Sequence, residues 1–598
     1  MTSIDELFKK PNLPSKRKLE APDRLDPTQA YKSAKLTANG DTKGKRHATI
    51  EAEDGDDIEA GPSLPPEDGE EYGADDDEDG RFFGGGVDQG TADALDYLDT
   101  RDTEQPYVAE KIDSAWLRKL ALNFEKRISK NAELRAKYED DPQKFMGSEA
   151  DLDADVKALS ILSEHPELYE EFARLGSVDS LVSLLSHENT DIAIDVIEII
   201  SELTDEDVNA EQAQWDALVD ALLKADLLSL LLSNLSRFDE SNDADRSGVY
   251  HSLAVLENLA SQPTTSTKIG QEPKLLEWLL GRAKAKEQPV SQNKQYAAEV
   301  LAILLQSSPA NRTRLTSAEL NGVDTLLQLL APYRKRDPPK DSDEEEYVEN
   351  VFDALTCLVD EDTGAGKMAF VEAEGVELAL IMLREGKMSK TRALRMLDHA
   401  CSGRFGAAVC EKLVEAAGLK TVFGMFMKKQ DAAATEHLLG IFASLLRSLP
   451  GGSPARIRTL AKFVEKDYEK LAKVVQLRRD YSTKLRAVDQ QIKEERASLS
   501  QGEQEDRADE WFSRRLDAGL FCLQTTDVIL AWLVAEDDGA KKKIMDMLAE
   551  RDEGPADLRS TLQEQLDGIE APKENENGDT EEGMLKDMLG TLIGFLVP

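Results

Sequence analysis

The hydrophobic pattern repeats six times between residues 171 and 450. Each unit begins at a turn, continues as an apolar helix, and ends with a second, amphipathic helix. The turns lie at Gly176, Asp226, Pro273, Gly322, Gly375 and Gly418. Their period is near 50 residues, roughly the range of helical repeat units. A chain built this way buries its core between neighbouring units and presents a long surface to partners.

Composition supports a helical array. Aromatic residues make up only 6% of the chain, and Leu and Ala dominate its middle part, which suits helix-on-helix packing better than a sheet core. The predicted fold is therefore all-α: an armadillo/HEAT-like right-handed α-solenoid over residues 171–450, with an N-terminal helical cap and a C-terminal helical hairpin.

The segment 106–170 has helical periodicity but does not match the repeat. Ser114 is a candidate helix N-cap, and Leu117, Leu120, Ala121 and Phe124 follow at the spacing of one helix face. We expect this segment to cover the first apolar face of the array, because terminal repeats of a solenoid need a cap.

The character of the chain changes after Pro450. Residues 455–500 predict one long charged helix whose apolar spacing is too irregular for a coiled coil, so residues 451–560 are interpreted as an intramolecular helical hairpin and the region closing the array. Residues 561–598 are interpreted as an acidic linker followed by a short apolar helix.

Charge is unevenly distributed. The net charge is −44; residues 1–50 contribute +5, residues 51–80 contribute −15, and the rest of the chain carries the remaining −34. Residues 1–105 lack apolar periodicity and are predicted to be a disordered arm, basic then acidic. Its basic clusters are either a nuclear import signal or simply a solvated arm: Lys16, Arg17, Lys18, Lys45 and Arg46.

The acidic repeat region disfavours direct binding of nucleic acid and favours a basic protein partner. In residues 190–205 the carboxylates share one helical stripe beside the apolar one. Such a stripe is either a solvated surface or a wall that binds Lys and Arg. Polar residues recur on the second helices of later units, and the candidate partner-binding residues are Asp191, Asp195, Glu198, Glu202, Glu257, Asn258, Glu299, Asn350, Asp353 and Asp398.

Motifs for catalysis are not evident in the sequence. It has no HExxH spacing, and Gly364-Ala365-Gly366-Lys367 is followed by Met368 instead of the Ser or Thr of a phosphate loop. The four cysteines form no CxxC pair and are interpreted as buried reduced thiols. No apolar run approaches the length of a membrane span. We therefore expect neither an enzyme nor a bound cofactor, metal or membrane.

Several strings resemble the β-catenin-like protein 1 family over about residues 105–550. They include Val108–Ser114, Leu122–Arg135, Pro142–Glu149, His187–Asp191, Glu299–Gln306 and Arg515–Phe521. The resemblance implies an armadillo-type nuclear scaffold associated with the spliceosome through the Nineteen complex and its Myb-type cell-division-cycle-5-like subunit. It also implies binding of basic, import-signal-like segments of splicing factors.

Two other functions stay open. An importin-α-like transport adaptor would carry a Trp-x-x-x-Asn array, but Val219 and Arg282 stand where Trp215 and Trp278 would require Asn. A cell-adhesion or signalling armadillo protein is disfavoured if residues 9–46 direct nuclear import, for which importin-α would be the partner. Homodimerisation is also left open by the sequence.

Overall fold

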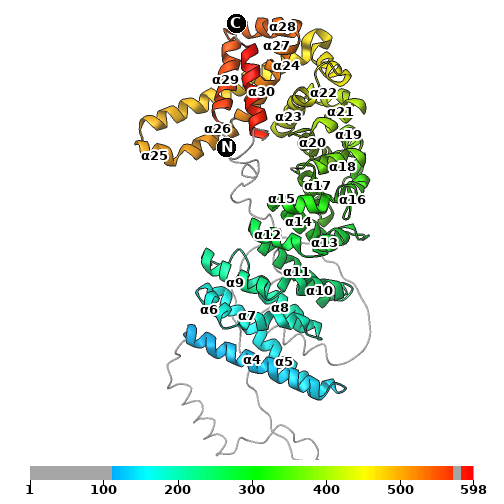
Figure 1. Ribbon diagram of the computed structural model, residues 1–598, viewed down its shortest axis with the longest axis vertical. Coiled ribbons are helices and arrows are strands. Elements are labelled where there is room, and N and C mark those ends of the chain that lie inside the picture. The colour runs from blue at the N-terminus through cyan, green and yellow to red at the C-terminus, as the bar shows by residue number, and fades with distance from the viewer. Residues whose placement is uncertain (1–110, 362, 570–580, 597–598) are drawn as a thin grey trace, which may run out of the picture. The chain divides into compact units, whose positions relative to one another are not determined.

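The computed structural model describes residues 111–361, 363–569 and 581–596, and residues 111–598 form one compact unit. All regular structure among these residues is helical. Six repeats follow one another, and each contains three helices (Figure 1). The all-α solenoid predicted from the sequence is confirmed.

The unit of three helices differs from the expected unit of two. The additional helix is the first of each repeat and precedes the turn: α6 (Tyr169–Arg174), α9 (Gln212–Lys224), α12 (Pro263–Gln271), α15 (Pro309–Thr316), α18 (Ala365–Glu372) and α21 (Ala407–Glu415). Most of these helices have nine residues or fewer, too few to show a clear hydrophobic period.

A left-handed residue joins the first helix to the second in every repeat. These residues have φ between 47° and 78°: Gly176, Asp226, Lys274, Asn321, Glu374 and Ala417. The second helices that follow are α7 (Ser177–Ser183), α10 (Leu227–Arg237), α13 (Leu275–Lys284), α16 (Gly322–Leu330), α19 (Gly375–Glu385) and α22 (Gly418–Phe426). The predicted turns therefore lie within one residue of the observed ones.

In the last repeat, there is a steric reason why glycine follows the left-handed residue. A Cβ at Gly418 would lie 2.7 Å from the carbonyl oxygen of Leu413 and 2.4 Å from that residue's side chain. The first and second helices thus approach too closely for any larger residue at this position.

The third helices form a continuous row in which each contacts the next. They are α8 (Thr190–Leu203), α11 (Asp243–Ala260), α14 (Gln292–Ser307), α17 (Asp343–Val359), α20 (Met388–Cys401) and α23 (Ala432–Ser448). Figure 1 shows α17, α20 and α23 on the side that faces α24–α30, and α16, α19 and α22 on the opposite side.

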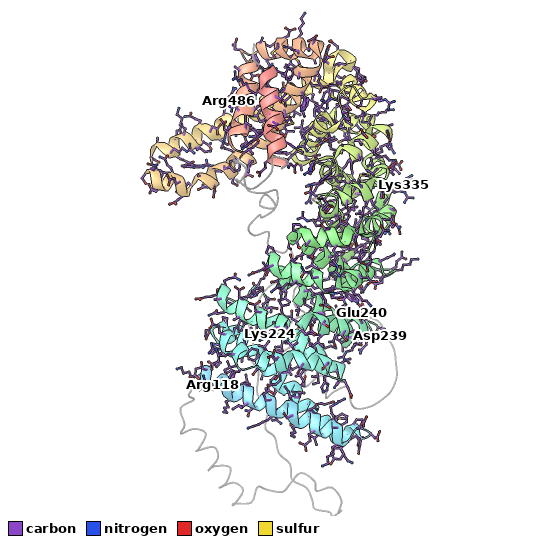
Figure 2. All side chains as sticks on the ribbon, in the orientation of Figure 1. Arg118, Lys224, Asp239, Glu240, Lys335 and Arg486 are labelled. Carbon is purple, nitrogen blue, oxygen red and sulfur yellow. The ribbon has the colours of Figure 1, made fainter. Side chains whose placement is uncertain are left out.

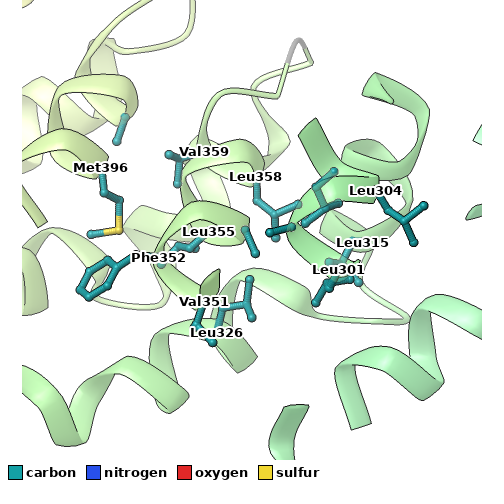
Figure 3. Packing of buried hydrophobic residues seen from close by; sticks show 14 of the residues in the cluster. Leu301, Leu304, Leu315, Leu326, Val351, Phe352, Leu355, Leu358, Val359 and Met396 are labelled. Atoms are coloured by element: carbon teal, nitrogen blue, oxygen red, sulfur yellow. The ribbon is translucent and has the colours of Figure 1, made fainter. Parts of the chain in front are cut away.

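The core lies between successive repeats, as expected. Leu301 and Leu304 of α14 are fully buried, and Figure 3 shows them near Leu355 and Leu358 of α17. Polar contacts also join repeats: Asn311 Nδ2 donates to the Ser266 carbonyl at 3.0 Å. Interior repeats are therefore held by both apolar packing and specific hydrogen bonds.

The N-terminal cap consists of α4 (Ser114–Lys137) and α5 (Met146–Lys157), and α5 contacts α8. Asp113, not Ser114, caps α4: its carboxylate accepts hydrogen bonds from the amides of Ala115 and Trp116 at 3.0 and 3.1 Å. The N-cap prediction was one residue too late, and a carboxylate is as good a cap as a hydroxyl.

The C-terminal region covers the last repeat. Its helices are α24 (Pro454–Ala497), α25 (Gln501–Asp506), α26 (Ala508–Asp517), α27 (Leu520–Glu536), α28 (Asp538–Ala549), α29 (Pro555–Asp567) and α30 (Glu581–Phe595). The expected single long helix is interrupted, because the backbone of α24 leaves the helical conformation over Glu465–Tyr468. The second half of α24 packs with α26 as the predicted hairpin, and α27 contacts α23.

An arginine ties this region to the last repeat. Arg456 is 2% exposed, and its guanidinium donates to the Glu536 carboxylate and the Leu445 carbonyl and lies 4.9 Å from the Trp532 ring centroid. Nearby, the rings of Phe423 and Phe442 stack with centroids 4.3 Å apart.

Some predictions concern residues outside the part of the chain that the structure describes. These are the disordered arm 1–105, the proposed import residues Lys16, Arg17, Lys18, Lys45 and Arg46, the acidic segment 51–80, and most of the linker before α30.

Candidate protein-binding face

The acidic stripe predicted for residues 190–205 is on α8, the third helix of the first repeat. Asp191 and Glu198 are exposed, while Asp195 and Glu202 are half-buried. Because α8 contains no Lys or Arg, any positive charge that faces this stripe comes from neighbouring elements or from a partner.

Asp195 has such neighbours within the cap. Lys157 of α5 lies 3.3 Å from Asp195 and 2.5 Å from Asp153. Burial, and then a hydrogen bond shared with Asp153, raise the pKa of Asp195 to about 7. A carboxyl group with this pKa is only partly charged near neutral pH, so Asp195 contributes less negative charge to the face than the sequence suggests.

Glu257 and Glu299 form a second acidic group on α11 and α14. Tyr296 donates a hydrogen bond to the Glu257 carboxylate. Burial raises the pKa of Glu257, and the carboxylates of Glu299, Glu206 and Asp205 raise it further, against the hydrogen bond from Tyr296. Repulsion among these carboxylates means that a cation placed between them would be stabilised by several charges at once.

The acidic positions of the fourth repeat are neutralised by the fifth. Arg395 of α20 lies 3.0 Å from Asp353 of α17, and Arg392 bonds Glu349. Asn350 is half-buried on the same helix. The expected acidic face thus does not continue unchanged along all six repeats.

Two predicted binding residues, Asn258 and Asp398, also have partners within the chain. Asn258 donates to the Ser201 carbonyl at 3.0 Å and to Thr204 Oγ1 at 3.3 Å. Asp398 Oδ2 lies 3.0 Å from His437 Nδ1, and only 19% of the Asp398 side chain is exposed. Both residues join neighbouring repeats, because Ser201 belongs to the repeat before Asn258 and His437 to the repeat after Asp398.

The residues that sequence reasoning missed are mainly the cations. Arg392, Arg395 and His399 follow one stripe of α20 at the spacing that marked the acidic stripe of α8. A comparison of charges at equivalent positions in the third helix of each repeat would have revealed these cations. Lys157 gave no such signal, since α5 lies outside the repeats.

The polar surface between repeats is also extensively paired. Arg282 of α13 lies 2.7 Å from Glu240, which Figure 2 labels beside Asp239 in the turn before α11. The candidate carboxylates of the first three repeats have neighbours within the chain as well: Ser163 donates to Glu202 at 3.3 Å, and Gln295 donates to Glu299 at 2.8 Å. We define the acidic face as Asp191, Asp195, Glu198, Glu202, Glu257 and Glu299.

No group of three or more His, Cys, Asp and Glu residues in the described ranges is arranged to hold a metal ion. No single described helix is long and apolar enough to cross a membrane; the bent pair α26 and α27 meets the criteria of length and composition only jointly.

The sequence decides which proteins this chain is related to. A family model described as "Catenin-beta-like, Arm-motif containing nuclear" matches residues 92–563. The chain belongs to this family. The Schizosaccharomyces pombe "Beta-catenin-like protein 1 homolog" is 39% identical over 498 residues, covering 83% of this chain and 86% of the relative. Human "Beta-catenin-like protein 1" is 38% identical over 500 residues, covering 81% and 86%.

The similarity to solved structures is weaker than the similarity to these sequence relatives. A structure from work on the interaction between cadherin and beta-catenin covers 86% of this chain and 98% of its own, with 12% identity and a TM-score of 0.43. Membership of the catenin-beta-like family therefore rests on sequence. It makes this chain an armadillo-type protein of a family described as nuclear, with a fold of the scaffold type.

Proposed function

We propose that this protein is a non-enzymatic scaffold of pre-mRNA splicing that binds Lys/Arg-rich, import-signal-like segments of splicing factors on its acidic face. The observation that carries this proposal is the grouping of the carboxylates of α8, α11 and α14 on neighbouring third helices. Repeats four and five differ, because arginines of α20 bind the acidic residues of α17.

The splicing role is proposed on the basis of the resemblance to the β-catenin-like protein 1 family. Its first candidate partner is the Myb-type cell-division-cycle-5-like subunit of the Nineteen complex. Residues 1–50 are proposed to direct nuclear import through importin-α, which agrees with a family described as nuclear.

The importin-α-like alternative is disfavoured by the position of the tryptophans. Trp215 is on α9 and Trp278 is on α13, the first and second helices of their repeats. No third helix of the six repeats contains a tryptophan. An array that reads basic side chains between tryptophans on the third helices is therefore not available here.

Charge reversal on the acidic face tests the binding proposal. The test variant Asp191→Lys with Glu198→Lys changes two exposed residues of α8. The control Asp179→Lys with Glu277→Lys makes the same change in net charge at exposed residues of second helices. We expect a labelled Lys/Arg-rich peptide to lose at least tenfold in affinity for the test variant, because exposed pairs contribute up to ~1 kcal/mol each and reversal adds repulsion.

The control should change affinity by less than threefold. Equal losses for both variants would show that only net charge attracts the peptide, and no loss for the test variant would exclude the acidic face. Affinity purification of the full chain from nuclear extract, followed by mass spectrometry, tests the splicing assignment separately; absence of Nineteen-complex proteins would contradict it.

A further inference from the structure

The C-terminal hairpin forms an arm. The second half of α24 packs along α26, and Figure 1 shows α25 at the end of the arm farthest from the row of third helices. Glu495 holds the two helices together, since it accepts hydrogen bonds from Trp511 Nε1 at 3.0 Å and from Arg514 at 2.8 Å. The arm is thus a built element with a fixed pairing of helices.

A hollow of about 420 Å³ lies between α24 and α26. Ile492, Trp511 and Phe512 line it. Ile492 and Trp511 are buried, but 50% of Phe512 is exposed, so an apolar surface opens to solvent on an otherwise polar arm. A volume of this size accepts a large aliphatic or aromatic side chain.

The hollow is bordered by cations. Lys493 and Arg496 of α24 line it and are exposed. The Arg496 guanidinium carbon lies 4.7 Å from the Trp511 ring centroid, which holds this cation at the edge of the hollow. The one acidic residue of the lining, Asp489, is 2.8 Å from Arg515. The lining is therefore positive in a chain whose net charge is −44.

We propose that this hollow binds a short acidic segment of a partner protein. One large apolar side chain of the segment enters the hollow against Trp511 and Phe512, and carboxylates next to it pair with Lys493 and Arg496. This combination matches the two properties of the site, because apolar area provides affinity while the cations select the charge of the flanking residues.

The surrounding charges limit the length of the acidic segment. Glu494, Glu503, Asp506, Asp509 and Glu510 are exposed on the same arm. A long polyanion such as RNA would lie against these carboxylates, whereas a peptide with one or two carboxylates beside its anchor meets only the cations at the hollow. The site therefore differs from the acidic face in both its chemistry and its place in the chain.

Selection from a random dodecapeptide library displayed on phage, with the full-length chain as bait, tests this proposal. Selected peptides are then titrated against two variants that remove cations from the same helix. Lys493→Gln with Arg496→Gln changes the hollow, and Lys484→Gln with Arg486→Gln is the control, since both of its residues are exposed and outside the lining (Figure 2 labels Arg486).

We expect a class of peptides with an apolar residue flanked by Asp or Glu, whose affinity falls at least tenfold for the first variant and less than twofold for the second. Phe512→Ser should abolish binding of this class, while Phe521→Ser, which changes a residue of α27 with 48% exposure, should not. Thermal melts of all variants check that the fold is intact.

Three outcomes would overturn the proposal. The first is independent of the selection: binding of a single-stranded RNA oligonucleotide that is lost in the Lys493→Gln, Arg496→Gln variant would identify a nucleic-acid site. A selected class that lacks acidic residues, or a library that yields no peptide sensitive to Phe512→Ser, shows that the hollow does not recognise acidic segments.

Discussion

The side-chain amide of Asn258 donates a hydrogen bond to the backbone carbonyl of Ser201, which lies 3.0 Å away and 57 residues earlier in the chain. Ser201 is in the last turn of α8, where carbonyl groups have no partner within their own helix. The third helix of one repeat thus satisfies the end of the third helix before it.

Removing this amide should loosen the junction of the first two repeats. Asn258→Ala is expected to lower the free energy of unfolding by about 1 kcal/mol, because it deletes a net hydrogen bond and leaves the Ser201 carbonyl with the longer contact from Thr204 Oγ1 at 3.4 Å. Chemical denaturation of the full chain measures the change. Affinity for a basic peptide should stay within twofold of that of the unaltered chain. A large loss of affinity with unchanged stability would show that Asn258 contacts the peptide.

Substitution in the core between repeats should have a larger effect. Leu304 is fully buried between neighbouring repeats, so Leu304→Ala is expected to cost roughly 2–5 kcal/mol. Gln306→Ala is the control, because Gln306 is exposed on the same helix. Thermal melts followed by circular dichroism compare the two; equal melting temperatures would place Leu304 outside the core.

The left-handed turns offer a stabilising substitution. Ala417 has φ of 57°, a conformation that costs an L-residue roughly 1–2 kcal/mol. Ala417→Gly should therefore raise the free energy of unfolding by about 0.5–1 kcal/mol after the greater entropy of glycine in the unfolded chain is included.

Ala416 provides the matched control for this turn. It precedes Ala417 and has φ of −73°, so Ala416→Gly gains nothing in the folded state and should destabilise by about 0.5–1 kcal/mol. In one denaturation series, we expect the two substitutions to change the free energy of unfolding in opposite directions. Destabilisation by both would contradict the left-handed conformation at Ala417.

Asp195 should make stability depend on pH. Its pKa is about 7 in the folded chain, above the ordinary 3.8, so the folded state binds the proton more tightly than the unfolded state. The stabilisation is fully present below about pH 4 and is lost as pH rises through about 7. Over the range from about pH 5 to about pH 8, Asp195→Asn should remove roughly 3 kcal/mol of this dependence, because about two pH units of that range lie below the folded-state pKa and each corresponds to about 1.4 kcal/mol.

Melting temperatures measured from pH 5 to pH 8 test this expectation. The control is Asp191→Asn, which changes an exposed carboxylate of the same helix. It should leave the change of melting temperature with pH as it is in the unaltered chain. If the melting temperature of the Asp195→Asn variant also changes with pH as it does in the unaltered chain, then protonation of Asp195 does not govern that pH dependence.

Much of the fold was predictable because it depends on local patterns. The period of the apolar helices located the six turns, and the core was correctly expected between neighbouring repeats, where Leu301 and Leu304 are buried. The short first helices were missed because six to nine residues with few apolar positions resemble a loop. The break in α24 at Glu465–Tyr468 was missed because neither Gly nor Pro marks it.

The face was less predictable than the fold. Which carboxylates share one side of a helix follows from sequence, and Asp191 and Glu198 are indeed exposed together on α8. Whether a carboxylate has a partner depends on residues about 40 positions away, as with Asp353 and Arg395. Such pairs are fixed by the stacking of repeats and require coordinates.

The pairing of α17 with α20 would also set a length for the basic segment proposed to bind the acidic face. Neighbouring helices pack about 8–10 Å apart, so α8, α11 and α14 together span about 20 Å between their axes. An extended chain covers that distance in about six residues. Beyond them Arg395 and Arg392 of α20 already pair with Asp353 and Glu349 of α17, so additional lysines in a longer partner would have to compete with these arginines. The protein would then distinguish basic segments by where their charge ends as well as by how much they carry.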